Sequence, residues 1–236
     1  MDGNTIIVTG AAGSLGSALS RVCAKAGWNV VMLDNDRRGL ERAYDDIVEA
    51  GLPEPALYPL DLAGAGPQDY DALLKTITDE FGGLDALVHC AARFVGLTPL
   101  EQTPPEEWLL TLQVNLNAPW LLSAQSLPLL RQSTAPRLYF MLEDLAAVEG
   151  PFWGAYGVSK HALRALVSQF AAECQATGIQ VLGINPGPLR SGLRSRAYHM
   201  ENPGSQPDPQ PLARRIRDYL EGRLEPGSLI VDLPDA

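Results

Sequence analysis

Strand-like and helix-like segments alternate along almost the whole chain, and this alternation restricts the folds that it can adopt. The strand-like segments are continuous apolar or β-branched runs, and the segments between them carry apolar residues at helical spacing. Strands of a parallel sheet are apolar on both faces because helices cover both sides of the sheet. The pattern therefore predicts an α/β fold, a doubly wound parallel sheet of about seven strands with helices on both faces.

The expected elements follow from composition, periodicity and capping signals. Thr103-Pro104-Pro105-Glu106 is a capping-box sequence with proline at the first helical position, so it opens a long helix. With no repeat and no linker, the chain is expected to form one domain over residues 1–236, with 202–211 as a surface loop. The expected strands are 5–9, 29–33, 56–60, 84–89, 137–142, 180–184 and 229–233, and the clearest expected helices are 14–26, 104–130, 155–176 and 212–220.

Charge and cysteine content exclude several functional classes. The 236 residues carry a net charge of −10 with no compensating basic run, which argues against a nucleic-acid or anionic membrane surface. The three cysteines are widely spaced and show neither a disulfide framework nor metal-ligand spacing, so no metal site is expected. No signal-peptide pattern opens the chain, and no apolar run approaches the roughly 20 residues of a membrane span. A cytoplasmic protein is expected.

A glycine-rich turn joins the first expected strand to the first expected helix. It comprises Gly10, Gly13, Ser14, Leu15 and Gly16. Glycines let backbone amides approach a pyrophosphate, which then lies at the positive end of the helix. Such a turn can also be an ordinary strand–helix connection, but its position at the start of an alternating fold favours a dinucleotide site.

Asp34, at the end of the second expected strand, bears on the choice of cofactor. A carboxylate there can accept hydrogen bonds from the adenosine ribose hydroxyls, and it repels the 2′-phosphate of NADP. The alternative role is an N-cap in a strand–helix loop. Arg37 and Arg38 follow closely and could restore NADP binding. NAD is therefore favoured, with NADP the less favoured cofactor.

Several motifs together carry a family resemblance. They are Tyr156-Gly157-Val158-Ser159-Lys160, Asn185-Pro186-Gly187-Pro188, Leu60-Asp61-Leu62 and Asn115. A lone Tyr-x-x-x-Lys is usually a solvent-facing pair, but this combination resembles the short-chain dehydrogenase/reductase family over roughly residues 5–233. The resemblance implies a Rossmann-type NAD(P)-binding domain and hydride transfer between nicotinamide and a carbonyl or secondary alcohol.

The chemistry explains why tyrosine and lysine occur together. A tyrosine has an ordinary pKa of about 10, and an ammonium four residues along a helix lowers it toward the working range. The resemblance implies that Tyr156 is the general acid/base, that Lys160 also holds the nicotinamide ribose, and that Asn115 anchors a relay water. It implies cofactor contacts from Gly10, Gly13, Ser14, Leu15, Gly16, Asp34, Asp61, Leu62, Cys90, Ala91, Tyr156, Lys160, Pro186, Gly187 and Ser191.

The sequence departs from the family pattern at several positions. The glycine spacing resembles the longer-chain branch, whereas the chain length and the position of Tyr156 match the shorter branch. The family's Asn-Asn-Ala-Gly segment is replaced by residues 89–92, His-Cys-Ala-Ala, in which His89 and Cys90 are expected to pack at a strand end.

The departure with the largest consequence is Glu143. It lies 13 residues before Tyr156, where the family has a serine that hydrogen-bonds the substrate oxygen. An ionised carboxylate can only accept hydrogen bonds, and beside a tyrosine it raises the phenol pKa. Either burial keeps Glu143 protonated, so that it can act as a donor, or it points away, or the usual chemistry is lost. We include it among the candidate catalytic residues.

The remaining expectations concern the substrate and the assembly. Residues 189–211 are expected to form a lid, whose Arg190, Arg194 and Arg196 either bind an anionic substrate or lie in a solvated loop. The resemblance implies a homodimer or homotetramer. An NAD(P)-dependent oxidoreductase is the leading interpretation, and a catalytically impaired NAD(P)-binding sensor or scaffold is the alternative. An interaction protein without cofactor is disfavoured by Asp34, Tyr156 and Lys160.

Overall fold

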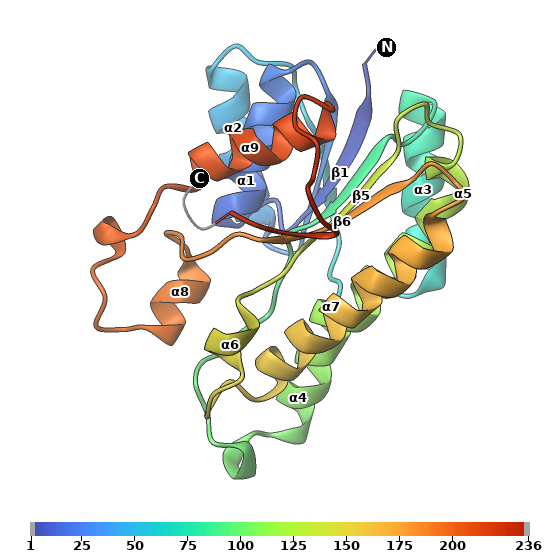
Figure 1. The fold of residues 1–236 in the computed structure, drawn as a ribbon. Helices are drawn as coiled ribbons and strands as arrows, with labels where there is room; N and C mark the ends of the chain where they lie inside the picture. The colour runs from blue at the N-terminus through green and yellow to red at the C-terminus, as the bar shows by residue number, and fades with distance from the viewer. Residues whose placement is uncertain (1–2, 234–236) are drawn as a thin grey trace.

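The computed structural model describes residues 3–233 and confirms the predicted doubly wound α/β fold (Figure 1). Seven strands form one sheet in the order β3-β2-β1-β4-β5-β6-β7, and all of its pairings are parallel. The strands are β1 (Thr5–Thr9), β2 (Asn29–Asp34), β3 (Ala56–Pro59), β4 (Ala86–His89), β5 (Arg137–Met141), β6 (Gln180–Asn185) and β7 (Ile230–Asp232). Residues 1–2 and 234–236, which the one-domain prediction includes, lie outside the described residues.

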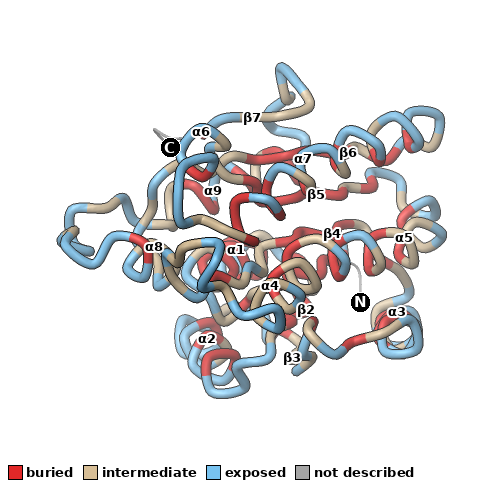
Figure 2. Tube along the Cα trace, turned by 90° about the horizontal axis from the view of Figure 1, so that it is seen from below, coloured by how far each residue is buried: buried red, intermediate tan, exposed pale blue. Residues whose placement is uncertain are grey.

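Two hydrophobic cores lie on opposite faces of the sheet. Side chains alternate along each strand, so Ile6 and Val8 of β1 enter one core while Ile7 between them enters the other. The first core includes α1 (Ser14–Lys25), α2 (Arg37–Glu49) and α9 (Pro209–Leu220). The second includes α3 (Pro67–Phe81), α5 (Ala118–Leu130) and α7 (Gly154–Cys174). Figure 2 shows the buried residues along the strands and the inward sides of these helices.

The long helix predicted over 104–130 is interrupted. It consists of α4 (Pro105–Leu112), a π-helical turn η2 (Gln113–Asn117) and α5. Pro119 has no N–H, so the Asn115 carbonyl loses the donor that an α-helix would supply four residues later. Single π-helical turns within α-helices are frequent at functional sites.

Short helices in the connections were not predicted. These are η1 (Leu100–Gln102), α6 (Leu145–Val148), α8 (Gly192–Ala197) and η3 (Pro203–Ser205). Asp144 caps α6 and Ser191 caps α8 through side-chain hydrogen bonds, and such local bonds stabilise turns too short to show periodicity. The helix predicted from 212 begins earlier, at Pro209, because Asp208 caps it. The segment 202–211, predicted as loop, therefore contains η3 and the first residues of α9.

Two further observations concern the described residues. None of the helices in the part of the chain that the structure describes is long and apolar enough to cross a membrane. Within residues 3–233, no three His, Cys, Asp or Glu side chains are grouped so that they could hold a metal ion.

Candidate functional site

A cavity of about 1040 Å³ opens at the carboxyl ends of the strands. In doubly wound sheets, ligands bind at this edge, where the strand order reverses. Here the order reverses between β1 and β4. Of the predicted site residues, Asn115 alone does not line the cavity; Gly10, Gly13, Ser14, Leu15, Gly16, Asp34, Asp61, Leu62, Cys90, Ala91, Glu143, Tyr156, Lys160, Pro186, Gly187 and Ser191 all line it.

The glycine turn brings backbone atoms into close contact. Gly10 has a φ of 68°, and a Cβ there would lie 2.6 Å from the Ala91 nitrogen. A Cβ on Gly16 would lie 2.1 Å from the Gly10 carbonyl oxygen. The N-cap of α1, Gly13, provides no side-chain cap, and the first turn carries no acidic residue. The amides at this helix end therefore suit an anionic group such as a dinucleotide pyrophosphate.

Asp34 is held by the glycine turn. Its Oδ2 accepts a hydrogen bond from the Ala12 amide at 3.0 Å, and its Oδ1 accepts one from the Asp36 amide at 3.0 Å. The alternative role of Asp34 as the N-cap of α2 is wrong, because Asp36 caps that helix by accepting from the Gly39 amide. A third carboxylate of this region, that of Asp61, accepts from Asn35 at 3.2 Å and also lines the cavity.

Tyr156 and Glu143 form a direct pair. The Tyr156 hydroxyl donates a hydrogen bond to Glu143 Oε2 at 2.9 Å. Burial, the Glu143 charge and this hydrogen bond together raise the pKa of Tyr156 well above its ordinary value. The possibility that Glu143 points away is therefore excluded, because its carboxylate accepts the Tyr156 hydrogen bond.

Lys160 lies over the Tyr156 ring. Its Nζ is 5.6 Å from the ring centroid and donates to the Met141 carbonyl at 3.0 Å. Burial lowers the pKa of Lys160, while the Glu143 charge opposes that shift. Burial also raises the pKa of the neighbouring Cys90 thiol to about 12, so this cysteine is not a thiolate nucleophile near neutral pH.

Asn115 connects the segment after β4 to α7. Its Oδ1 accepts from the Arg93 amide at 2.6 Å, and its Nδ2 donates to the Arg93 carbonyl and to Ser159 Oγ, each at 3.0 Å. Ser159 in turn donates to the Tyr156 carbonyl at 2.7 Å. Sequence reasoning missed the role of Ser159, although it stands next to Lys160 within the Tyr-x-x-x-Lys motif. The chain of bonds fixes α7 against the segment that follows β4.

His89 packs inside the fold, as expected. Its ring stacks on Phe140 with centroids 4.9 Å apart, and its Nε2 lies 2.8 Å from Ser123 Oγ. Burial lowers the pKa of His89 to about 3, so the ring is neutral at ordinary pH.

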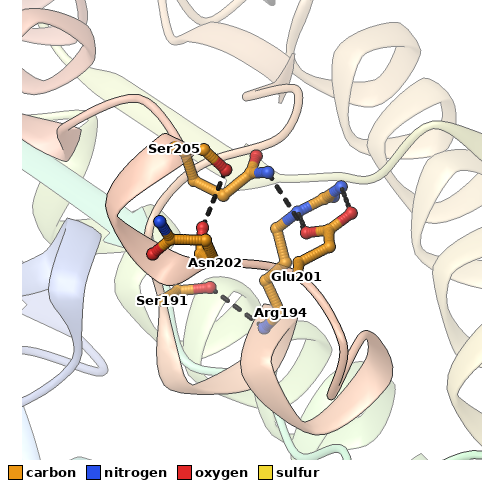
Figure 3. A network of polar contacts seen from close by, with 6 residues as sticks. Ser191, Arg194, Glu201, Asn202 and Ser205 are labelled. Carbon is orange, nitrogen blue, oxygen red and sulfur yellow. Dashed lines mark hydrogen bonds and ion pairs between the residues drawn. The ribbon is translucent and has the colours of Figure 1, made fainter.

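The segment 189–211, predicted as a lid, is held together by one of its arginines, Arg194 (Figure 3). Arg194 donates from Nε and Nη2 to the two carboxylate oxygens of Glu201, each at 2.7 Å. The Arg194 amide donates to Ser191 Oγ at 3.2 Å, and Gln206 also donates to Glu201. Ser191, predicted as a cofactor contact, thus also caps α8.

The other two lid arginines also have partners within the protein. Arg196 donates to the Phe94 carbonyl at 2.9 Å, and Arg190 lies 3.8 Å from Asp208. Arg196 connects the segment 189–211 to the segment after β4. Arg190 pairs within its own segment and its side chain is 50% exposed, which agrees with the solvated-loop alternative. Their contacts cross sequence separations that local patterns do not reveal.

Comparison with known proteins gives consistent matches. The short chain dehydrogenase family model matches residues 4–202. An uncharacterized oxidoreductase of Escherichia coli strain K12, YciK, is 30% identical over 198 residues, covering 84% of this chain and 78% of the relative. A short chain dehydrogenase structure from Pseudomonas syringae is 35% identical with a TM-score of 0.90, covering 98% of this chain and 94% of that one.

A third similar protein carries a bound nucleotide. The short chain dehydrogenase of Shigella flexneri 2a strain 301, complexed with NADP, is 27% identical with a TM-score of 0.90. The match covers 98% of this chain and 96% of that one. These matches favour the oxidoreductase interpretation over the non-catalytic sensor or scaffold.

Proposed function

We propose that this chain, which belongs to the short-chain dehydrogenase family and is an NAD(P)-binding oxidoreductase, performs its chemistry at the Tyr156 hydroxyl. The observation that carries this proposal is that Tyr156, Lys160 and the glycine turn line one cavity. When bound, the nicotinamide supplies or accepts the hydride, and a small-molecule carbonyl or secondary alcohol is its partner.

In this proposal Tyr156 moves the proton. It gives the hydroxyl proton to a carbonyl oxygen during reduction and, as phenolate, takes the alcohol proton during oxidation. Lys160 stabilises the phenolate by its charge. Only one of its three N–H groups is used by Met141, so the others can hold the nicotinamide ribose. Asn115 positions α7, and its main-chain carbonyl, which faces Pro119 instead of an N–H donor, is our candidate for holding the relay water.

The remaining predicted contacts divide between the two halves of the cofactor. The glycine turn would hold the pyrophosphate, and Asp34, Asp61 and Leu62 would surround the adenosine. Nearer the nicotinamide, the contacts would come from Cys90, Ala91, Pro186, Gly187 and Ser191, which line the cavity between the sheet edge and the lid.

We propose NAD as the preferred cofactor because of the carboxylates at the adenosine end. Asp34 is fixed by two backbone amides, so it cannot easily move away from a 2′-phosphate. NADP is the second candidate, supported by the NADP complex of the Shigella relative. Arg37 and Arg38, exposed at the start of α2, would then bind the phosphate.

Fluorescence titration with NADH and NADPH tests the cofactor proposal. We expect NADH to bind at least about tenfold more tightly, and Asp34→Ser to remove most of that preference, because one lost charge contact is worth roughly 1–2 kcal/mol. Asp45→Asn, on the exposed side of α2, is the matched control. Equal affinities for the two nucleotides in the wild type would overturn the choice of NAD.

Turnover of a panel of ketones, aldehydes and secondary alcohols tests the catalytic assignment. Lys160→Ala should weaken both nucleotide affinity and turnover, because it removes the ribose contact and the charge beside the phenolate. Unchanged behaviour would mean that Tyr156 and Lys160 are not the catalytic pair.

We also propose a homodimer or homotetramer located in the cytoplasm, without nucleic-acid or membrane partners. Large apolar side chains are exposed on three of the helices: Leu109 on α4 is 65% exposed, Trp120 on α5 is 50% and Val158 on α7 is 49%. Association would bury these side chains. The net charge of −10 supports the absence of polyanionic partners.

A further inference from the structure

Aromatic side chains from two segments far apart in the sequence meet at the proposed substrate end of the cavity. The ring of Phe94, in the segment after β4, lies 5.2 Å from Trp153 and 5.1 Å from Tyr156, centroid to centroid. Trp153 also lies 5.7 Å from Tyr156. All three line the cavity. We call Phe94 and Trp153 the aromatic wall, because Lys160 already lies over the Tyr156 ring.

The charged side chains that line the cavity do not suit an anionic substrate. The cavity-lining arginines are engaged elsewhere: Arg194 with Glu201, Arg196 with a main-chain carbonyl, and Arg93 with Glu107 at 2.5 Å. Lys160 is directed to the Met141 carbonyl and toward the proposed ribose position. Glu143, by contrast, is half-buried and has no cationic side chain within ion-pair distance among the described residues.

We propose that the substrate carries a cationic nitrogen close to its reacting carbon, and that this ammonium group binds between the Glu143 carboxylate and the aromatic wall. A carboxylate is the natural partner of a cation, and aromatic faces attract ammonium groups, including quaternary ones that cannot donate a hydrogen bond. The inference rests on the proposed function and names the substrate class for the same site: an amino ketone or the corresponding amino alcohol.

The pair formed by Glu143 and Tyr156 gives the cation a second role. Without substrate, the Tyr156 proton is directed at Glu143 Oε2 and not at a carbonyl oxygen. A bound ammonium neutralises the Glu143 charge, which weakens that hydrogen bond and removes one cause of the raised pKa of Tyr156. The substrate thereby releases the acid that its own reduction requires.

The proposed reduction needs only a hydride from the nicotinamide and a proton from Tyr156. The carbonyl carbon accepts hydride from the reduced nicotinamide, the C=O π bond breaks, and the oxygen takes the Tyr156 proton. The products are the secondary amino alcohol, oxidised nicotinamide and the Tyr156 phenolate, which is reprotonated from solvent. The ammonium group itself is unchanged.

Two ketones of nearly the same shape test the inference. Acetonyl-trimethylammonium and methyl neopentyl ketone differ in one atom, N⁺ against C, beside the reacting centre. We expect kcat/KM of the wild type to favour the ammonium ketone by about tenfold or more. Because the ammonium also makes the carbonyl intrinsically more reactive, the decisive quantity is the change of this ratio in Glu143→Gln, which should lower it by about tenfold. Glu149→Gln, exposed and outside the cavity, should leave the ratio unchanged.

A binding measurement decides the case when neither ketone is turned over. Calorimetric titration of the nucleotide-free protein should show that the ammonium ketone binds more tightly than its neutral isostere, and that Glu143→Gln or Trp153→Leu removes the difference. Equal binding of both ketones, or an undiminished preference in Glu143→Gln, would overturn the inference. Failure of the proposed function is a different result, namely that neither NADH nor NADPH binds the wild type.

Discussion

The two ends of the cavity are built in different ways. At the cofactor end, main-chain atoms of the glycine turn and of the segment after β4 lie against one another, and missing Cβ atoms make that contact possible. At the proposed substrate end, side-chain caps hold the short helices α6 and α8, and the Arg194–Glu201 ion pair ties α8 to the residues that follow it. A site made of main chain admits few substitutions, whereas a site made of side chains can change its chemistry while the fold stays the same. Glu143, which contacts Tyr156, is a side chain of this kind.

The largest expected effect is at the cofactor end. Gly16→Ala places a Cβ 2.1 Å from the Gly10 carbonyl oxygen, so the turn must shift. We expect NADH affinity to fall about a hundredfold or more and the free energy of unfolding to fall by roughly 1–3 kcal/mol, as overpacking does. Fluorescence titration and thermal melting measure the two effects.

Gly64→Ala is the matched control for this change. Gly64 lies in the turn after β3, and a Cβ there would meet no atom within 4 Å. Its affinity and stability should be close to those of the wild type. If Gly16→Ala bound NADH as tightly as Gly64→Ala does, the cofactor end would tolerate substitution as well as the substrate end. The proposed difference between the two ends would then be wrong.

The second largest effect is expected at the proposed substrate end, where Glu143 contacts Tyr156. Glu143→Ser removes the charge that raises the pKa of Tyr156 and introduces a hydroxyl donor. Oxidation of a neutral secondary alcohol requires the phenolate, so its rate rises with pH through the pKa of Tyr156. Lowering that pKa should move the rise to lower pH by about one unit or more. Turnover of neutral carbonyls near neutral pH should increase about tenfold to a hundredfold.

The pH dependence of kcat/KM, measured in wild type, Glu143→Ser and Glu143→Gln, checks this prediction. The glutamine variant removes the charge while nearly preserving shape, so it should show the shift in pH without the full gain in rate. Identical profiles in all three proteins would mean that Glu143 does not contact Tyr156 in the working enzyme.

The same contrast explains how far the sequence alone could predict this molecule. The succession of strands and helices, the glycine turn and the Tyr156–Lys160 pair follow from short local patterns, because buried strands and helix termini leave recognisable signals in the sequence. The Glu143–Tyr156 hydrogen bond joins the segment after β5 to α7, and the sequence left open whether Glu143 points toward Tyr156. The aromatic wall of Phe94 and Trp153 joins segments about 60 residues apart, and nothing local marks either ring as part of a site.

The π-helical turn η2 could have been predicted in part from the sequence. Pro119 is visible in the sequence, and its missing N–H could have indicated that the predicted helix over 104–130 would not be regular at Asn115. The side-chain bonds of Asn115 to Arg93 and Ser159 depend on the packing of α4 and α7 and had no such signal.

The smallest expected effect concerns the proposed lid, residues 189–211. Arg194 and Glu201 form a two-pronged ion pair whose side chains are 23% and 32% exposed, so solvent screens it only in part. Arg194→Met should lower the free energy of unfolding by roughly 0.5–1 kcal/mol, which in a chain of this size corresponds to a fall in Tm of about 1–4 °C. Because the pair holds the lid and not the glycine turn, KM for the substrate should rise several-fold while NADH affinity changes little.

A double-mutant cycle with Glu201→Gln separates the pair from its surroundings. If the ion pair carries the effect, adding Glu201→Gln to Arg194→Met should cause little further loss of stability or rise in KM. Independent, additive losses would mean that Arg194 acts mainly through its contact with Tyr198, 4.5 Å from guanidinium carbon to ring centroid, and so through the aromatic end of the cavity. A loss of NADH affinity as large as the change in KM would show that the lid serves both ends, and the two halves of the cavity would then respond as one unit.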